Sequence, residues 1–161
     1  MRMIDCLKRS TFLTFYILLT SLSAQAQIPR IIGKWQSDRD LTMAFAKDHG
    51  KLSERTNLFL DQLMGRLTLT FTKSTVSSSM PDSNSTTFEG VKSQLRGFTE
   101  KNRYKALAAT KTQVAILSLE PVTGIKTISV YNFEDANTMW VYLGGESFPN
   151  LNIREYFRRI Q

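Results

Sequence analysis

The residues able to do acid–base or metal chemistry are few in this chain. His49 is the single histidine among 161 residues, and Cys6 is the single cysteine. A cluster of histidine and cysteine ligands for a metal ion therefore cannot be assembled. Asp48-His49-Gly50 could supply part of a catalytic triad, but the same residues are ordinary turn composition, which is the interpretation we favour.

Two further patterns fall short of catalytic motifs. Gly145-Glu146-Ser147-Phe148-Pro149 lacks the second glycine of a nucleophile elbow. Glu134 and Asp135 could form a carboxylate pair, although adjacent acids between two strand-like segments are more often solvated turn residues. The inventory predicts no catalytic residue, no metal and no cofactor, and we expect that the protein is not an enzyme.

The first 26 residues have the pattern of a secretory signal peptide. Basic residues precede the uncharged run Ser10 to Ser23, and Ala24-Gln25-Ala26 is the small-x-small pattern that signal peptidase cleaves. The apolar run is too short for a membrane anchor, which needs roughly 20 residues. Cys6 is not at the cleavage point, so no lipid anchor is expected. The sequence predicts a soluble domain, residues 27–161, without disulfides, most consistent with the bacterial periplasm.

The charge of the chain is basic but dispersed. The formal net charge is +7, and the denser groups of basic residues are Lys92 to Lys111 and Arg154 to Arg159. The first group lies on strand-like sequence, where alternate residues face solvent, so a solvated exterior accounts for it. We expect no nucleic-acid partner, and contact with a membrane only during export.

Periodicity predicts a short helical region followed by strands. Ile31 to Gln36 is strand-like, Asp40 to Lys47 could form a weak helical turn, and Ser53 caps a helix that ends at Gly65. From Arg66 onward the apolar residues alternate, as in half-buried strands. The clearest later strands are Asn102–Thr110, Thr112–Leu119, Ile125–Phe133, Thr138–Leu143 and Asn152–Ile160.

Short connections between these segments favour antiparallel pairing in sequence order. The Ser- and Thr-rich segment 74–87 is interpreted as a loop, with two or three less certain strands between Thr75 and Phe98. The fold class is therefore mainly β: an antiparallel up-and-down barrel of about eight strands with a helical insert between strands one and two. A two-layer sandwich is the alternative.

Gly33-Lys34-Trp35 near the start and Arg158-Arg159 at the end resemble the two ends of calycin (lipocalin-like) barrels. The chain is similar to small exported bacterial domains of that kind that have no assigned function. The resemblance implies that Gly33, Trp35, Arg158 and Arg159 close one end of the barrel, with an arginine over the indole. Alternation allows only one of the two arginines to lie there, and we favour Arg158 slightly. The long helical insert and the lack of a C-terminal helix depart from the lipocalin pattern.

Two hypotheses for function remain open. The first is a binding module for a small apolar ligand, because a barrel of about eight strands can hold one such molecule. The residues proposed to line its cavity are Leu69, Phe71, Tyr104, Tyr131 and Trp140. The second is a periplasmic protein-interaction module, such as an inhibitor or immunity protein, using the insert loops Phe45–Arg55 and Gly144–Leu151.

Overall fold

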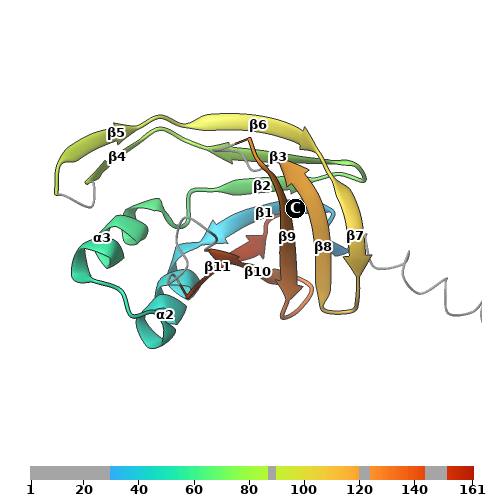
Figure 1. Ribbon diagram of the computed structural model, residues 1–161, viewed down its shortest axis with the longest axis horizontal. Helices are drawn as coiled ribbons and strands as arrows, with labels where there is room; N and C mark the ends of the chain where they lie inside the picture. Colours follow the sequence, from blue (N-terminus) through green and yellow to red (C-terminus); the bar gives the residue numbers. More distant parts are fainter. Residues whose placement is uncertain (1–29, 87–89, 120–123, 144–151) are drawn as a thin grey trace, which may run out of the picture.

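The computed structural model describes residues 30–161 except 87–89, 120–123 and 144–151 (Figure 1). The predicted signal peptide, residues 1–26, and the predicted loop 144–151 lie outside the described residues. The helices are α2 (Arg39–His49) and α3 (Glu54–Leu63). The first strands are β1 (Gly33–Asp38), β2 (Thr68–Phe71), β3 (Thr75–Met80), β4 (Ser83–Thr86), β5 (Lys92–Leu95) and β6 (Phe98–Arg103). The later strands are β7 (Lys105–Ala109), β8 (Gln113–Leu119), β9 (Lys126–Phe133), β10 (Thr138–Leu143) and β11 (Ile153–Arg159).

One antiparallel sheet carries most of these strands. Its nine described strands follow the order β6-β3-β2-β1-β11-β10-β9-β8-β7, so the first and last strands of the chain pair in its middle. The edge strands β6 and β7 are separated in sequence by Tyr104 alone, and the sheet curls into a nearly closed barrel (Figure 1). The predicted barrel with a helical insert after strand one is confirmed, and the alternative sandwich does not form.

The predicted strand Asn102–Thr110 is in fact two strands that meet at Tyr104. β6 pairs with β3, whereas β7 pairs with β8. The Tyr104 N–H donates to the Ser74 carbonyl at 3.0 Å, and its hydroxyl donates to the Thr72 carbonyl at 2.7 Å. These hydrogen bonds fix the chain at the point where it passes from pairing with β3 to pairing with β8. The bent segment β6–β7 therefore forms both edges of the sheet. Counted that way, the barrel agrees with the predicted number of about eight strands.

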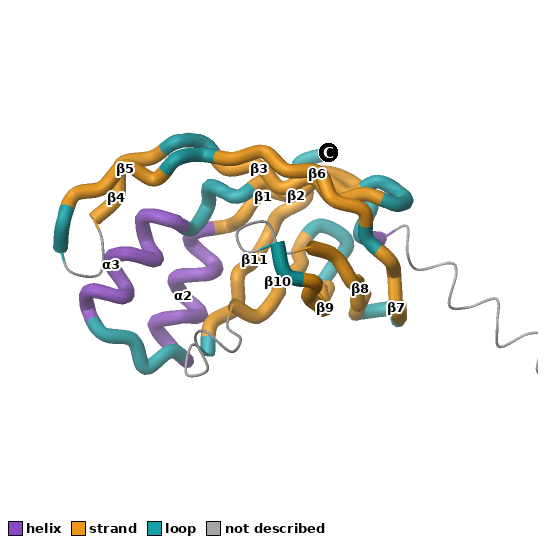
Figure 2. Tube along the Cα trace, turned by 45° about the horizontal axis from the view of Figure 1, so that its top comes forward, coloured by secondary structure: helices purple, strands orange, loops and turns teal. Residues whose placement is uncertain are grey.

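The two or three less certain strands expected between Thr75 and Phe98 are confirmed as β3, β4 and β5, whereas the loop assigned to segment 74–87 is corrected, because most of that segment forms β3 and β4. β4 pairs with β5, and this hairpin extends the β3–β6 pair beyond the barrel toward α3 (Figures 1 and 2). The Thr86 N–H donates to the Gln62 side chain of α3 at 2.7 Å. Serine and threonine act here as strand residues whose partners are supplied by a distant part of the chain.

Both helices begin at side-chain caps. Asp38 accepts a hydrogen bond from the Leu41 N–H at 3.0 Å, and Ser53 accepts one from the Thr56 N–H at 3.2 Å, as predicted for Ser53. The helices pack at one end of the barrel, where α2 contacts β11. A small apolar cluster joins them to the barrel and consists of Ala46, Leu60, Met64 and Ile153.

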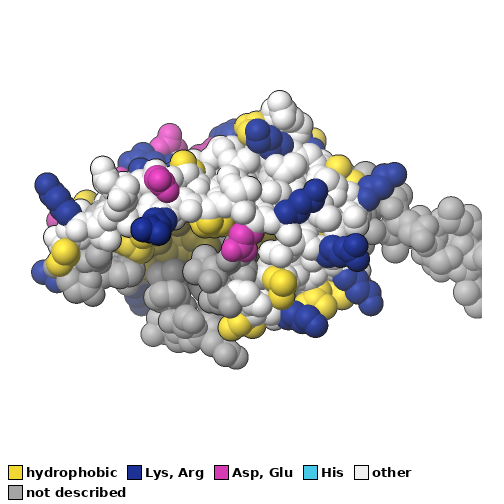
Figure 3. Space-filling model, turned by 90° about the horizontal axis from the view of Figure 1, so that it is seen from above, with side chains coloured by type: hydrophobic (Ala, Val, Ile, Leu, Met, Phe, Trp, Pro, Cys, Tyr) yellow, Lys and Arg dark blue, Asp and Glu magenta, His cyan; other side chains and the backbone are white. Residues whose placement is uncertain are grey.

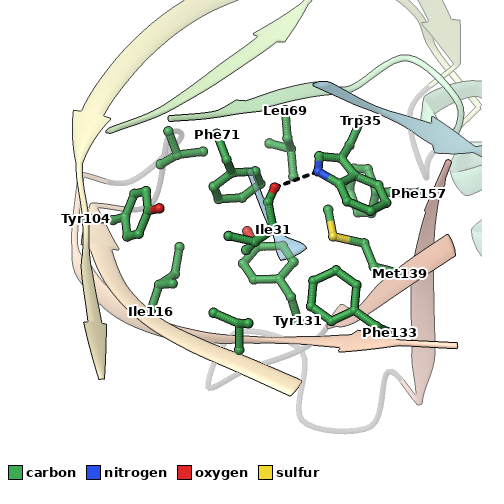
Figure 4. Packing of buried hydrophobic residues seen from close by; sticks show 12 residues of the cluster. Ile31, Trp35, Leu69, Phe71, Tyr104, Ile116, Tyr131, Phe133, Met139 and Phe157 are labelled. Atoms are coloured by element: carbon green, nitrogen blue, oxygen red, sulfur yellow. Dashed lines mark hydrogen bonds between the residues drawn. The ribbon is translucent and has the colours of Figure 1, made fainter. Parts of the chain in front are cut away.

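The main core fills the barrel away from the helices. Figure 4 shows its side chains converging from opposite walls, and it contains Ile31, Trp35, Leu69, Phe71, Val76, Tyr104, Val114, Ile116, Tyr131, Phe133, Met139 and Phe157. Trp35, Val114 and Met139 are fully buried. The pairing between β9 and β10 is short, with only Met139–Phe133 and Trp140–Asn132 in register.

Candidate functional site

Trp35 and Arg159 close the end of the barrel remote from the helices. The Arg159 guanidinium carbon lies 4.2 Å from the centroid of the indole, and Trp35 is opposite Arg159 in the β1–β11 ladder. The indole N–H donates to the Ile31 carbonyl at 2.8 Å (Figure 4). The guanidinium also donates to the Ile32 carbonyl at 2.7 Å. The planar cation therefore covers the ring and satisfies backbone groups of the segment that enters β1.

The prediction that Arg158, rather than Arg159, covers the indole of Trp35 is wrong. Arg158 faces outward and forms an ion pair with Asp38 at 2.5 Å. The register decides between the two arginines, because neighbouring strand residues point to opposite sides of the sheet. Gly33 belongs to the closure for a different reason: its φ is +135°, and an added Cβ would lie 2.5 Å from an Arg159 guanidinium nitrogen.

Four of the five residues proposed to line a cavity lie together in the buried core. Leu69, Phe71, Tyr104 and Tyr131 all point inward, and the Phe71 ring contacts Tyr104 and Tyr131 edge-on at centroid distances of 5.9 and 5.3 Å. Trp140 lies on the opposite face of the sheet from its inward-facing neighbour Met139. The inward aromatic residues thus pack against one another.

The interior changes character toward the helices. The inward faces of these strands also carry serines, each two residues along its strand from a core residue: Ser37 from Trp35, Ser78 from Val76, Ser118 from Ile116 and Ser129 from Tyr131. Four serine side chains fill far less of an eight-stranded barrel than the aromatic layer does. Thr127 and Glu100 share these inward faces and are exposed, whereas Ser37 and Ser78 are buried.

Glu155 is the buried carboxyl of this polar end. It lies on the inward face of β11 between Ile153 and Phe157 and is only 6% exposed. The Ser37 hydroxyl donates to the Glu155 Oε1 at 2.7 Å. Ser37 is itself fixed by the Gly65 N–H, which donates to its hydroxyl oxygen at 2.9 Å. Because that bond occupies a lone pair, the single Ser37 proton is directed at the carboxylate.

The surroundings of Glu155 favour its neutral form. Burial raises the pKa of the Glu155 carboxyl to about 7, against the opposing effect of the Ser37 hydrogen bond. Burial, and secondarily the nearby charge of Glu155, raises the pKa of the Tyr131 phenol above its usual range. The carboxyl therefore changes charge near neutral pH beside a phenol that remains protonated.

This carboxyl can act as an acceptor for a hydrogen-bond donor or a cation brought into the barrel. Val141 lies opposite Glu155 on β10, in the part of the wall where β9 and β10 are no longer in register. Among the described residues, no group of three or more His, Cys, Asp and Glu side chains could hold a metal ion. Glu155 was missed by the sequence interpretation, although a carboxylate between two apolar residues at same-face spacing in Ile153-Arg154-Glu155-Tyr156-Phe157 was a signal for it.

A second notable cluster lies on the outer face of β10 and β11. The Arg154 guanidinium carbon lies 4.0 Å from the Trp140 ring, 4.5 Å from Phe45 and 5.6 Å from Tyr142. The Phe45 ring also stacks on His49, with centroids 4.2 Å apart. The Arg154 Nε is buried without a hydrogen-bond partner. Sequence reasoning missed this cluster, because only α2 packing on β11 brings Phe45 to it.

Searches against protein-family models, curated proteins and solved structures found no match to this chain. In the described part of the chain, no helix is both long and apolar enough to cross a membrane.

Proposed function

We propose that this protein is an exported calycin-like binding module that takes a small, largely apolar ligand carrying a basic or hydrogen-bond-donating group. The observation that supports the proposal most is Glu155, a carboxyl 6% exposed inside the barrel, at the end opposite the Trp35 closure. Ligand sites are typically apolar with a few placed polar groups. Burying a carboxyl opposes folding, so its position is better explained by a binding role than by stability.

The neighbouring residues fit this role. Tyr131 and Val141 supply apolar surface near Glu155, and Ser37 is a small side chain in contact with it. The calycin assignment rests on the same barrel and on the Trp35–Arg159 closure. Export rests on the pattern of residues 1–26, with the periplasm as the proposed location.

The binding proposal is tested with two aliphatic fluorescent probes of equal length, one ending in an amine and one in a carboxylate. At about pH 8, above the Glu155 pKa of about 7, we expect the amine probe to bind and the acid probe to bind more weakly. Glu155→Gln should reduce amine binding by at least about tenfold, as expected when a charge-assisted hydrogen bond worth roughly 1.5–3 kcal/mol is lost. The matched control is Glu134→Gln, which alters an exposed glutamate in the β9–β10 turn.

The proposal fails if neither probe binds and solvent extraction of the purified protein releases no stoichiometric ligand. If the wild type and Glu155→Gln bind the amine probe equally, Glu155 does not contact the ligand, and the proposal of a ligand with a basic or hydrogen-bond-donating group is wrong.

A protein-interaction module is the second candidate, and the Arg154 cluster favours it. Tyr142 is 54% exposed next to Trp140 and Arg154. Tyrosine, tryptophan and arginine are the residues enriched at the centres of protein interfaces. A pull-down from periplasmic extract should then retain a partner at moderate salt, and Tyr142→Ala should release it, whereas Leu58→Ala on α3 should not.

A further inference from the structure

The outer face of β7, β8 and β9 exposes a continuous group of aliphatic side chains. Ile128, Leu107 and Val130 are 58%, 45% and 41% exposed. The register places Ile128 beside Leu117 and Val130 beside Ala115, so the side chains form neighbouring rows across the strands. The aliphatic face consists of Leu107, Ala115, Leu117, Leu119, Ile128 and Val130.

Lysines border this aliphatic face. Lys105 lies opposite Leu117, in the same cross-strand row as Ile128, and Lys126 lies opposite Leu119. Both lysines are exposed, and β7, β8 and β9 contain no aspartate or glutamate. Figure 3 shows hydrophobic side chains between Lys and Arg side chains near the barrel end of the molecule. The face is therefore apolar at its centre and positive at its edge.

We propose that the aliphatic face docks onto the surface of an anionic lipid bilayer. Leu, Ile and Val side chains can enter the boundary between headgroups and acyl chains, while lysines reach the anionic headgroups with their long stems along the apolar surface. The positive edge supplies the charge complementarity that selects anionic lipid over neutral lipid. This docking is independent of ligand binding at Glu155, which lies on the inward face of a different strand.

The composition of the face argues against the two other occupants. Protein interfaces are enriched in aromatic residues and arginine and depleted in lysine, whereas the described β7–β9 strands present aliphatic residues and lysines outward. A second copy of the chain would bring Lys105 and Lys126 of both copies to one interface. Like charges held close together in this way oppose association.

The proposal is tested with a polarity-sensitive fluorophore attached to a single cysteine in the full chain carrying Cys6→Ser. One variant carries Ile128→Cys, and the matched control carries Leu58→Cys, which has the same exposed fraction of 58% on α3. The probes are vesicles of phosphatidylcholine alone or mixed with phosphatidylglycerol. We expect a blue shift and a brighter signal at position 128 with the anionic vesicles only, and no change at position 58.

The apolar run of residues 10–23 could itself attach the full chain to vesicles, but it would do so with either lipid and would not place position 128 preferentially in the bilayer. An equal response at positions 58 and 128, or no response at 128, overturns the proposal. A fluorescence change at position 128 with a protein from periplasmic extract, but not with vesicles, also overturns the proposal of membrane docking.

Lys105→Gln and Lys126→Gln should each weaken binding to the anionic vesicles by about fivefold, as expected from roughly 1 kcal/mol per lysine near such a surface. Lys51→Gln, remote in sequence in the connection between α2 and α3, is the charge-matched control. Salt at about 1 M, where the Debye length is roughly 3 Å, should abolish binding. Equal effects of all three substitutions would show that only net charge matters and would overturn the assignment to this face.

Discussion

At the closed end of the barrel, inward positions carry Trp35, Phe133 and Phe157. The Arg159 guanidinium stacks on the Trp35 indole there and is hydrogen-bonded to a backbone carbonyl. At the helix end, the same strands β1, β9 and β11 carry Ser37, Ser129 and Glu155 inward. The closed end therefore has large side chains and a guanidinium that has hydrogen-bond partners. The helix end has small side chains and a carboxyl whose charged form is disfavoured.

The difference separates an end whose residues stabilise the fold from an end that includes a destabilising group. Burial of aromatic side chains stabilises the fold, so the closed end needs no further explanation. Burial of a carboxyl destabilises it, so the helix end requires another reason for its residues. Arg158 and Arg159 are adjacent but differ in a similar way, because Arg158 faces outward in an ion pair with Asp38 and Arg159 covers the core.

The largest expected effect is at the closed end. Trp35→Ala should lower the free energy of unfolding by about 3–5 kcal/mol, because a fully buried aromatic side chain leaves a cavity. Urea denaturation measures the change. Trp140→Ala, at a half-buried indole on the outer face, is the control and should cost clearly less. Equal losses for the two variants would show that the closure is not a special part of the core.

At the helix end, stability should depend on pH through Glu155. The folded pKa of about 7 is above the ordinary value of 4.5. The folded protein therefore holds this proton more tightly, and stability present below about pH 4.5 is lost as the pH rises to about 7. The full loss is on the order of 3 kcal/mol, from about 1.4 kcal/mol per pKa unit.

Glu155→Gln removes this dependence. The variant should melt like the wild type near pH 4 and be more stable than the wild type near pH 8. Thermal unfolding across this range measures the difference. Glu134→Gln, at an exposed turn residue, serves as the control and should leave the wild-type profile in place. A wild type and Glu155→Gln with parallel profiles would contradict the assignment of a buried, titrating carboxyl.

A smaller effect is expected for Arg159→Ala, about 1–2 kcal/mol from the lost contact with the indole. A double-mutant cycle with Trp35→Ala should show that the two side chains are coupled, because they are in direct contact. Arg158→Ala removes an exposed ion pair and should show no coupling to Trp35. Coupling of Trp35 to Arg158 instead would reverse the assignment of the closing arginine.

The smallest expected effect is for deletion of residues 1–26. Both ends of the barrel are built from residues after this segment, so the deleted protein should be soluble with an unchanged cooperative melt. Calorimetry of the two forms makes the comparison, with deletion of residues 1–33, which removes Ile31 and Gly33, as a destabilised reference. A loss of folding after deletion of 1–26 would show that this segment is structural rather than a targeting signal.

Local sequence patterns determined the fold class, the helical insert and most strand positions. Thr138–Leu143 was predicted with the bounds observed, because it is a short run rich in β-branched and aromatic residues with turn residues on both sides. The serine-rich β3 and β4 were expected only as strands without bounds and in part as a loop, because their strand conformation depends on partners in β2, β6 and β5 rather than on their own composition.

The sequence by itself placed Gly33-Lys34-Trp35 and Arg158-Arg159 on the first and last strands, and the resemblance to calycin barrels implied that Trp35 and one of these arginines meet. Only the tertiary structure decided that Arg159 covers the indole, because the register of β1 and β11 depends on the closed sheet. It also decided the surroundings of Glu155. Alternation gives the face of a strand residue, but whether that face is buried, and beside which hydroxyl, depends on strands far apart in sequence that the barrel brings together.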